Sequence, residues 1–302
     1  MNSKNNKKNF ALIGAGGYIA PRHVEAIKHT NNDLVALLDP YDGVGYIDKY
    51  FPNASYFKEA ERFDRHLYKH KETIDFVSIC SPNYLHDAHI RLSLRNGCDV
   101  ICEKPLVLRN RNLQALKKIE QETGKKVYNI LQLRHHPLIK QLKEKYKDTS
   151  KIHNVTLDYI TPRGTWYDYS WKGDISKSGG VVANIGVHFF DMLIWIFGDV
   201  KSFNVETFEE GIISGAGKRS TGTLQLETAN VNYNLSIVKE DLPWNEWKPF
   251  RSIKIDGEEI EFSTGFADLH KISYEEILKG NGFTLEDVEP TIKLIDNLRT
   301  EK

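Results

Sequence analysis

The chain has 302 residues, 40% of them hydrophobic and 27% charged, so it is long enough for two domains with buried cores. Its 41 basic and 41 acidic side chains balance and are interspersed, which argues against nucleic-acid and membrane-surface binding, functions that use a strong positive field. A local cluster of cations must therefore hold any anionic ligand.

Residues 1–9 are rich in lysine and asparagine and are expected to form a disordered leader, not a signal peptide. We find no run of about 18 apolar residues, the length needed to cross a bilayer, and so expect a cytoplasmic protein without a membrane span. Cys80, Cys98 and Cys102 lack a C-x-x-C spacing and are expected to be reduced structural thiols. We predict no metal site.

The first predicted elements are an apolar strand at residues 10–13, a glycine-rich turn at 14–17, a helix and a second strand at 34–38. A buried strand leading through glycines into a helix N-terminus is typical of a dinucleotide pyrophosphate site, because backbone N–H groups can face the phosphates. The spacing departs from a strict G-x-G-x-x-G, so this signal is weak by itself. We predict cofactor contacts from Gly14, Gly16, Gly17, Tyr18 and Ile19.

Asp39 ends the second strand, about 20 residues past the glycines. A carboxylate in this place accepts hydrogen bonds from the adenosine ribose and repels a 2′-phosphate. No arginine or lysine follows in residues 40–42 to reverse that preference. The sequence therefore favours NAD over NADP.

Apolar strands and amphipathic helices continue to alternate, with strands expected at 76–80, 100–102 and 127–131 and helices at 20–30, 84–96 and 110–122. This alternation predicts an α/β Rossmann domain with a doubly wound parallel sheet over residues 1–133. Such sheets bind ligands at the carboxyl ends of their strands. Further cofactor contacts are therefore predicted from Ser81, Asn83, His86, Glu103, Lys104 and Gln132.

From residue 134 the pattern changes to an α+β domain, predicted to bind substrate and to mediate oligomerisation over residues 134–302. Helices are expected at 137–146, 180–197, 273–278 and 285–299, a strand at 155–160, and further strands at 202–208, 222–227 and 231–238, followed by a pair turning at 256–257. Strict apolar and polar alternation in 231–237 predicts a large, mainly antiparallel open sheet with one polar face.

Asn184 and His188 are four residues apart on the helix expected at 180–197, and Asp191 lies three further on. The three side chains should therefore share one face, beside an apolar stripe. One interpretation is a helix that faces a functional site. The other is a core histidine whose hydrogen bond to Asp191 is purely structural.

Two motifs resemble those of the glucose-fructose oxidoreductase/inositol dehydrogenase/MocA family over nearly the whole chain. Residues 103–106 read Glu-Lys-Pro-Leu at a strand end, and residues 179–191 read GGVVANIGVHFFD. The resemblance implies that Lys104 and His188 face the nicotinamide and the sugar carbon being oxidised. Asn184 is a departure, since the family often has aspartate there.

Stretches 17–23, 78–86, 129–136, 184–189 and 273–278 are similar to UDP-N-acetyl-2-amino-2-deoxyglucuronate 3-dehydrogenases of the WlbA/WbpB type. That resemblance implies NAD-dependent oxidation of the third sugar carbon, on the route to diacetamido uronic acids of bacterial surface polysaccharide such as the lipopolysaccharide O-antigen. It also implies a homotetramer.

Alcohol oxidation of this kind needs a base for the hydroxyl proton and benefits from a positive charge beside the developing alkoxide. Lys104 and His188 suit these two roles. A desolvated lysine has a lowered pKa and can act as the base, whereas a histidine needs little adjustment. The sequence leaves open which of the two takes the proton.

The polar and aromatic loop at 161–178 offers groups for a nucleotide diphosphate and a carboxylate. We predict substrate contacts from Arg163, Tyr167 and Lys172, together with Lys104, Asn184 and His188, and a cofactor contact from Trp171. Arg163 is the first candidate because its guanidinium pairs with two oxygens at once. A solvated loop without a ligand is the competing interpretation.

Two other functions are retained for the whole chain. One is an NAD-dependent dehydrogenase of a free sugar or polyol, which UDP would not inhibit. The other is a non-catalytic dinucleotide sensor or corepressor, which would have no need of Lys104 and His188.

Overall fold

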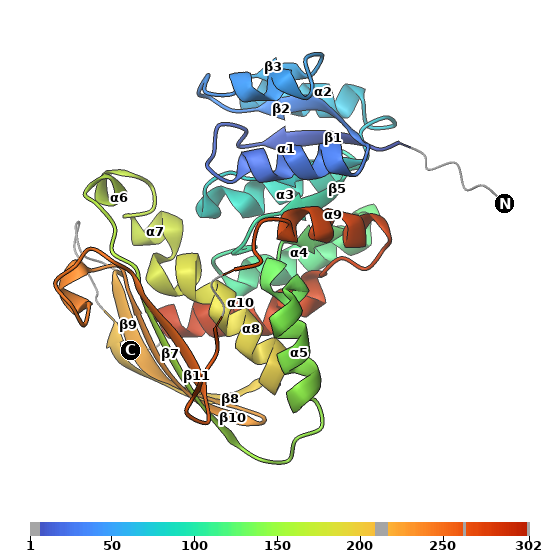
Figure 1. Ribbon diagram of the computed structural model, residues 1–302. Coiled ribbons are helices and arrows are strands. Elements are labelled where there is room, and N and C mark those ends of the chain that lie inside the picture. Colours follow the sequence, from blue (N-terminus) through green and yellow to red (C-terminus); the bar gives the residue numbers. More distant parts are fainter. Residues whose placement is uncertain (1–6, 209–216, 262–263, 301–302) are drawn as a thin grey trace. The chain divides into compact units, whose positions relative to one another are not determined.

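The computed structural model describes residues 7–208, 217–261 and 264–300, and the chain forms two compact units (Figure 1). Unit 1 contains the described residues up to Val107, then Arg111–Gln132 and Ala267–Asp287. Unit 2 contains Leu108–Asn110, Leu133–Phe266 and the described residues from Val288 onward. The predicted division at residue 133 differs in one main respect, because the segment 267–287 belongs to unit 1.

Unit 1 is built on a parallel sheet with the strand order β3-β2-β1-β4-β5-β6. Strands β2 and β3 lie on one side of β1, and strands β4 to β6 lie on its other side. Its strands are β1 (Asn9–Ile13), β2 (Asp33–Leu38), β3 (Ser55–Phe57), β4 (Phe76–Ile79), β5 (Asp99–Cys102) and β6 (Val127–Asn129). Each neighbouring pair in this order is parallel. The prediction of a doubly wound Rossmann sheet is confirmed, and its switch point lies between β1 and β4.

The helices of unit 1 are α1 (Ala20–His29), α2 (Ala60–Lys69), α3 (His86–Arg95), most of α4 (Asn110–Thr123) and α9 (Leu269–Leu278), with short 3-10 turns at Gly45–Lys49 and Asn83–Leu85. A further 3-10 turn at Gln132–His135 leads from unit 1 into unit 2. Two elements, β3 and α2, are not predicted from the sequence. The reason is their weak pattern: β3 is short and mostly exposed, and in α2 the buried residues are Phe63 and Leu67.

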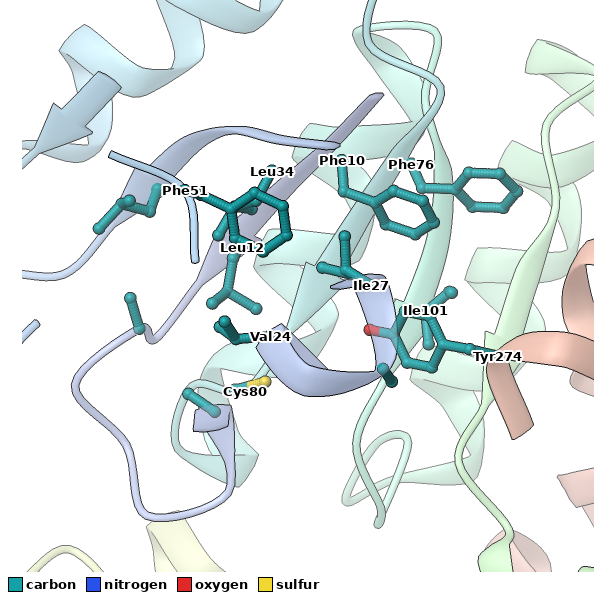
Figure 2. Packing of buried hydrophobic residues seen from close by; sticks show 14 of the residues in the cluster. Phe10, Leu12, Val24, Ile27, Leu34, Phe51, Phe76, Cys80, Ile101 and Tyr274 are labelled. Atoms are coloured by element: carbon teal, nitrogen blue, oxygen red, sulfur yellow. The ribbon is translucent and has the colours of Figure 1, made fainter. Parts of the chain in front are cut away.

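Helix α9 belongs to unit 1 because its apolar face completes the core of the Rossmann sheet. Tyr274 is fully buried, and its ring lies 5.8 Å from that of Phe10 on β1. Figure 2 shows Tyr274 in one cluster with Phe10 and with Ile27 of α1. Burying side chains of this size contributes roughly 1.5–3 kcal/mol each, which holds the distant segment in place.

Unit 2 is built on a mixed sheet with the order β12-β11-β7-β10-β9-β8. Its strands are β7 (His153–Ile160), β8 (Val200–Phe208), β9 (Arg219–Leu226), β10 (Ala229–Ser236), β11 (Phe250–Ile255) and β12 (Glu258–Glu259). The pair β7 and β10 is parallel and the other neighbouring pairs are antiparallel. The predicted mainly antiparallel sheet is confirmed, and β10 alternates between buried and less buried side chains over most of its length.

The helices of unit 2 are α5 (Pro137–Tyr146), α6 (Trp166–Tyr169), α7 (Ile175–Ser178), α8 (Val187–Phe197) and most of α10 (Leu285–Thr300), with a 3-10 turn at Lys239–Asp241. Helix α5 packs on α8 (Figure 1). The helix expected at 180–197 is confirmed as helical over its whole length, and it contains a π-helical turn at Val182–Gly186 before α8.

The expectation about membrane spans needs a correction. Ile175–Phe197 is long and apolar enough to cross a membrane by length and composition, although the sequence analysis finds no such run. In the structure 83% of its most apolar window is buried. The hydropathy of this segment is therefore accounted for by its place in the core of unit 2.

The cysteines Cys80, Cys98 and Cys102 are free and buried, in agreement with their predicted structural role. Burial raises the pKa of the Cys98 thiol to about 12 and holds the pKa values of the Cys80 and Cys102 thiols well above their ordinary range. A thiol that stays protonated is a poor nucleophile and a poor metal ligand.

We expect Gly14→Ala to destabilise unit 1 by about 3 kcal/mol or more. Gly14 has φ +83°, and a Cβ there would lie 2.6 Å from backbone atoms of Cys80 and Ser81. Chemical denaturation measures the change. Gly124→Ala is the matched control, because φ is also positive but nothing lies within 4 Å of its added Cβ. Equal losses in the two variants would contradict the close approach of Gly14 to β4.

Candidate active site

The glycine loop in unit 1 is closed by Asp39. Gly16 N–H donates to Asp39 Oδ2 at 2.8 Å, and Tyr41 N–H donates to Asp39 Oδ1 at 2.9 Å. Gly14 N–H donates to Leu38 O at 2.8 Å, which ties the loop to the end of β2. The carboxylate predicted to select NAD is therefore fixed directly beside the loop.

Several features of unit 1 fit a bound dinucleotide. An added Cβ at Gly17 would lie 3.1 Å from Gly14 O, which is too close for an easy fit. Glycine at this position therefore leaves the backbone of the loop without a side chain between it and a ligand. Within the described residues, no side chain caps the N-terminus of α1, which leaves that end for an anion. Gln132, at the end of β6, has a buried Oε1 with no hydrogen-bond partner among the described residues. Tyr18, by contrast, is 89% exposed.

The residues that follow β4 are held by histidines of α3. Ser81 Oγ lies 2.8 Å from His89 Nδ1. The two ring nitrogens of His86 lie 2.8 Å from Ser81 O and from Pro105 O, so this side chain links the ends of β4 and β5. Burial lowers the pKa of His86, whereas the two carbonyl oxygens raise it because both accept hydrogen bonds. Asn83 is buried beside them, in the 3-10 turn.

Glu103 and Lys104 follow β5, and the peptide bond between Lys104 and Pro105 is cis. Glu103 is buried, and its Oε1 accepts hydrogen bonds from His23 Nε2 at 3.0 Å and from His270 Nε2 at 2.9 Å. Lys104 is partly exposed. Glu103 is predicted to contact cofactor ribose, but in this structure its Oε1 accepts hydrogen bonds from two histidines.

The same three side chains form a candidate metal-binding cluster that the sequence analysis does not anticipate. One ligand atom from each of His23, Glu103 and His270 lies within 4.8 Å of the others. However, both Nε2 atoms point at one carboxylate oxygen at hydrogen-bond distance, so each needs a proton where a metal would bind. The geometry describes a hydrogen-bonded network better than a metal centre.

His89 gives unit 1 a dependence of stability on pH. Burial lowers the pKa of His89 to about 4, from an ordinary 6.5, so between these values the unfolded chain binds the extra proton. Stability therefore rises as the pH rises from 4 to 6.5. Integrating that difference gives a loss of about 2 kcal/mol on going from pH 7.5 to pH 5.

We expect His89→Gln to reduce the loss of stability between pH 7.5 and pH 5 by about 2 kcal/mol. Glutamine has no titrating group, and its constant effect on the Ser81 contact cancels in the difference between the two pH values. Urea denaturation at both pH values measures it, with the exposed His29 replaced by glutamine as control. The same loss in wild type and His89→Gln would contradict the assignment.

In unit 2, Asn184 and His188 lie at the junction of the π-helical turn and α8. Asn184 Nδ2 donates to the hydroxyl of Tyr167, at 3.1 Å, and Tyr167 is buried. Burial raises the pKa of Tyr167, which keeps the hydroxyl protonated. His188 is partly exposed. Single π turns within helices are frequent at functional sites, and nothing in the local sequence predicts this one.

Arg163, Lys172 and the tryptophans come together in the loop that follows β7. Lys172 Nζ lies 5.5 Å from the ring of Trp166 and 5.8 Å from that of Trp171. Burial and, to a smaller extent, the positive charge of Arg163 lower the pKa of Lys172. The positive charges of Arg163 and Lys172 repel each other, and a bound anion would offset that repulsion. This cluster therefore suits phosphate or carboxylate groups.

Asp191 has a structural role in unit 2. Its two carboxylate oxygens accept hydrogen bonds from Arg134 at 2.9 and 2.8 Å, and Thr291 Oγ1 donates at 3.0 Å. Asp191 and Arg134 are both buried. Asp191 therefore neutralises a buried arginine, and Asn184 and His188 remain the candidates for ligand contact on this helix.

The structure places the predicted site residues in two sets. Unit 1 holds the glycine loop, Asp39, Ser81, Asn83, His86, Glu103, Lys104 and Gln132, and unit 2 holds Arg163, Tyr167, Trp171, Lys172, Asn184 and His188. No role is predicted from the sequence for His23 and His270, which contact Glu103, or for Tyr274, which contacts His23. Their shared signal is a polar side chain within an apolar helix face, which is too common to be used without a structure.

Known proteins match the chain over both units. Residues 8–130 match a model of an oxidoreductase family's NAD-binding Rossmann fold, and residues 150–237 match that family's C-terminal alpha/beta domain. The WlbA (WbpB) dehydrogenase of Thermus thermophilus, crystallised with NAD and UDP-GlcNAcA, is 43% identical with a TM-score of 0.91, over 98% of this chain and 95% of that one. The same enzyme crystallised with NAD and alpha-ketoglutarate gives 42% and 0.91, over 98% and 96%.

Curated relatives match at lower identity. D-glucoside 3-dehydrogenase of Escherichia coli K12 is 29% identical over 210 residues, which are 66% of this chain and 57% of the relative. Inositol 2-dehydrogenase of Rhizobium meliloti 1021 is 26% identical over 227 residues, which are 73% and 65%. The chain thus spans less than two thirds of the length of these two relatives.

Proposed function

The chain belongs to the Gfo/Idh/MocA oxidoreductase family, and we propose that it uses NAD to oxidise the 3-hydroxyl of UDP-N-acetyl-2-amino-2-deoxyglucuronate (UDP-GlcNAcA) to the 3-keto sugar. The observation that carries the proposal is 43% identity, along almost the whole chain, to an enzyme crystallised with NAD and UDP-GlcNAcA. The glycine loop and Asp39 of unit 1 suit the dinucleotide, and the cationic loop of unit 2 suits an anionic sugar nucleotide.

The glycine loop and Asp39 would hold NAD, which when bound would supply the acceptor for the hydride from the third sugar carbon. Lys104 and His188 share the remaining chemistry: one takes the hydroxyl proton, and the other donates a hydrogen bond to the oxygen as negative charge develops on it. Lys104 is our first candidate for the base. Tyr167 holds the amide of Asn184 through its hydroxyl, at 3.1 Å, and Asn184 in turn is proposed to orient the sugar beside His188.

Arg163 and Lys172 are proposed to bind the diphosphate or the uronate carboxylate, since a forked guanidinium matches paired oxygens. Trp171 is proposed to pack on the nicotinamide. We further propose that the product feeds diacetamido uronic acid synthesis for the bacterial O-antigen, that the enzyme is cytoplasmic, and that it acts as a homotetramer.

The test is the absorbance of NADH in a single turnover of the protein with NAD and UDP-GlcNAcA. Single turnover is needed because tightly held NADH would stall a steady-state assay until a 2-oxo acid reoxidises it. We expect one equivalent of NADH per active site, and multiple turnovers when 2-oxoglutarate is added. If no NADH forms with UDP-GlcNAcA while another sugar reduces NAD, the substrate assignment is wrong.

Inhibition by UDP separates the two kinds of substrate. Strong competition between UDP and the substrate is expected for a nucleotide sugar. Absence of competition, together with turnover of an unmodified sugar or polyol, would instead identify a free-sugar dehydrogenase. Absence of all turnover with intact NAD binding would favour the non-catalytic sensor.

A further inference from the structure

A buried chain of hydrogen bonds ends at the backbone N–H of Lys104. The chemistry proposed above does not use this chain. Ser78 Oγ lies 2.6 Å from the hydroxyl of Tyr274, and that hydroxyl lies 2.7 Å from His23 Nδ1. His23 Nε2 contacts Glu103 Oε1, which His270 Nε2 also contacts. All of these residues belong to unit 1 and are at most 5% exposed.

The direction of this chain follows from the donors and acceptors available. Glu103, when ionised, only accepts, so His23 and His270 must both carry a proton on Nε2. Burial lowers the pKa of His23, which favours a neutral ring with an unprotonated Nδ1. Tyr274 must then donate to His23 Nδ1 and accept from Ser78. Glu103 thus sets the tautomer of His23, and the hydroxyl of Tyr274 complements it by donating to the other ring nitrogen.

Glu103 is a buried anion anchored on several sides. Burial alone would raise its pKa, but the hydrogen bonds from His23 and His270 outweigh that effect and hold the pKa well below its ordinary range. Its second oxygen, Oε2, accepts the backbone N–H of Lys104 at 3.2 Å. The carboxylate therefore connects the histidines to the backbone of the proposed catalytic lysine.

We propose that the chain Ser78–Tyr274–His23–Glu103–His270 is a positioning device for Lys104, and that helix α9 supplies two of its members as positioning residues. The inference rests on the proposed function for the catalytic role of Lys104. A lysine on a turn has many rotamers, and fixing its backbone narrows the range of positions that its ammonium can reach. A misplacement of about 1 Å costs roughly 100-fold in rate.

The first test compares Glu103→Gln and Tyr274→Phe with Ser273→Ala. Phenylalanine keeps the packing of Tyr274 on Phe10 and removes one hydroxyl. Ser273 is the control because it is buried on the same helix but donates to Leu269 O, within α9. We expect kcat to fall by about 100-fold in Glu103→Gln and by about 10-fold in Tyr274→Phe, with KM for NAD changed less than about threefold and Ser273→Ala unaffected.

The second test is the double variant Glu103→Gln/Tyr274→Phe. If the two residues act through one chain, Tyr274→Phe should lower kcat by no more than about twofold in the Glu103→Gln background. Independent, merely structural roles would instead give multiplied losses, and these would overturn the proposal. Values of kcat near wild type in both single variants would overturn it as well.

The third test does not depend on turnover and so distinguishes this proposal from the proposed function. Nitrogen-15 NMR of the histidine rings should show His23 protonated on Nε2 in both proteins, because Glu103 still accepts that proton. In Tyr274→Phe the His23 Nδ1 resonance should shift, because Nδ1 loses the hydrogen bond from the Tyr274 hydroxyl. An unchanged His23 signal in Tyr274→Phe overturns the proposed chain, even if the substrate assignment holds. One equivalent of tightly bound divalent metal in the purified protein, lost in His270→Gln, overturns it in favour of a metal site.

Discussion

Lys104→Ala and His188→Ala are each expected to lower kcat with UDP-GlcNAcA by about 10³-fold while NAD still binds. Positioned acid and base groups contribute typically 10²–10⁴-fold, and neither residue forms the pyrophosphate site. Stopped-flow absorbance gives kcat, and isothermal titration gives the affinity for NAD. Lys117→Ala is the control, because Lys117 is also a partly exposed lysine of unit 1, paired with Glu286 at 3.6 Å. Unchanged turnover in both variants would contradict the proposed mechanism.

Chemical rescue decides which of the two residues takes the proton. A small primary amine should restore part of the turnover of Lys104→Ala if lysine is the base, with a rate that increases with the amine's basicity. Imidazole should do the same for His188→Ala if histidine is the base. Rescue of His188→Ala alone would reverse our preference for Lys104.

Asp39→Ala is expected to lower kcat/KM with NAD by roughly 10- to 100-fold and to raise it with NADP. A carboxylate that accepts hydrogen bonds from the ribose contributes about 1.5–3 kcal/mol, and its charge repels a 2′-phosphate. The ratio of kcat/KM for the two cofactors measures the change. A wild type that already prefers NADP would contradict this role of Asp39.

Asp39→Asn separates the effect of the negative charge on cofactor choice from the effect of the side chain on the position of the glycine loop. Its side-chain oxygen can still accept the N–H of Gly16, now 2.8 Å from Asp39 Oδ2, so the glycine loop should keep its position. We expect the Asn variant to accept NADP better than the wild type while losing less activity with NAD than Asp39→Ala. Equal loss with NAD in both variants would mean that the carboxylate acts mainly by holding the loop.

The Rossmann sheet and the cofactor loop were predictable because their signals are local. Gly14 and Asp39 stand at the ends of short apolar strands, and that arrangement reports the site even with irregular glycine spacing. The elements β3 and α2 were not predicted, because few of their residues are buried and their sequences therefore show only a weak apolar pattern. The π-helical turn that carries Asn184 has no local signature that would separate it from the start of α8.

The contacts made over long sequence separations could not be predicted. His23 and Tyr274 are 251 residues apart and Arg134 and Asp191 are 57 apart, and each pair meets only because the folded chain brings it together. Asp191 illustrates the consequence. On sequence grounds it shares a face with Asn184 and His188, but its carboxylate is committed to Arg134 and Thr291.

The mechanism we propose requires Lys104 and His188 to flank the sugar carbon that is oxidised. A crystal structure of the protein with NAD and UDP-GlcNAcA tests it most directly. We expect the 3-hydroxyl of the sugar within hydrogen-bond distance of both Lys104 Nζ and a ring nitrogen of His188, with Arg163 or Lys172 on an anionic group of the ligand. A sugar ring bound with its 3-hydroxyl out of reach of both side chains would contradict it.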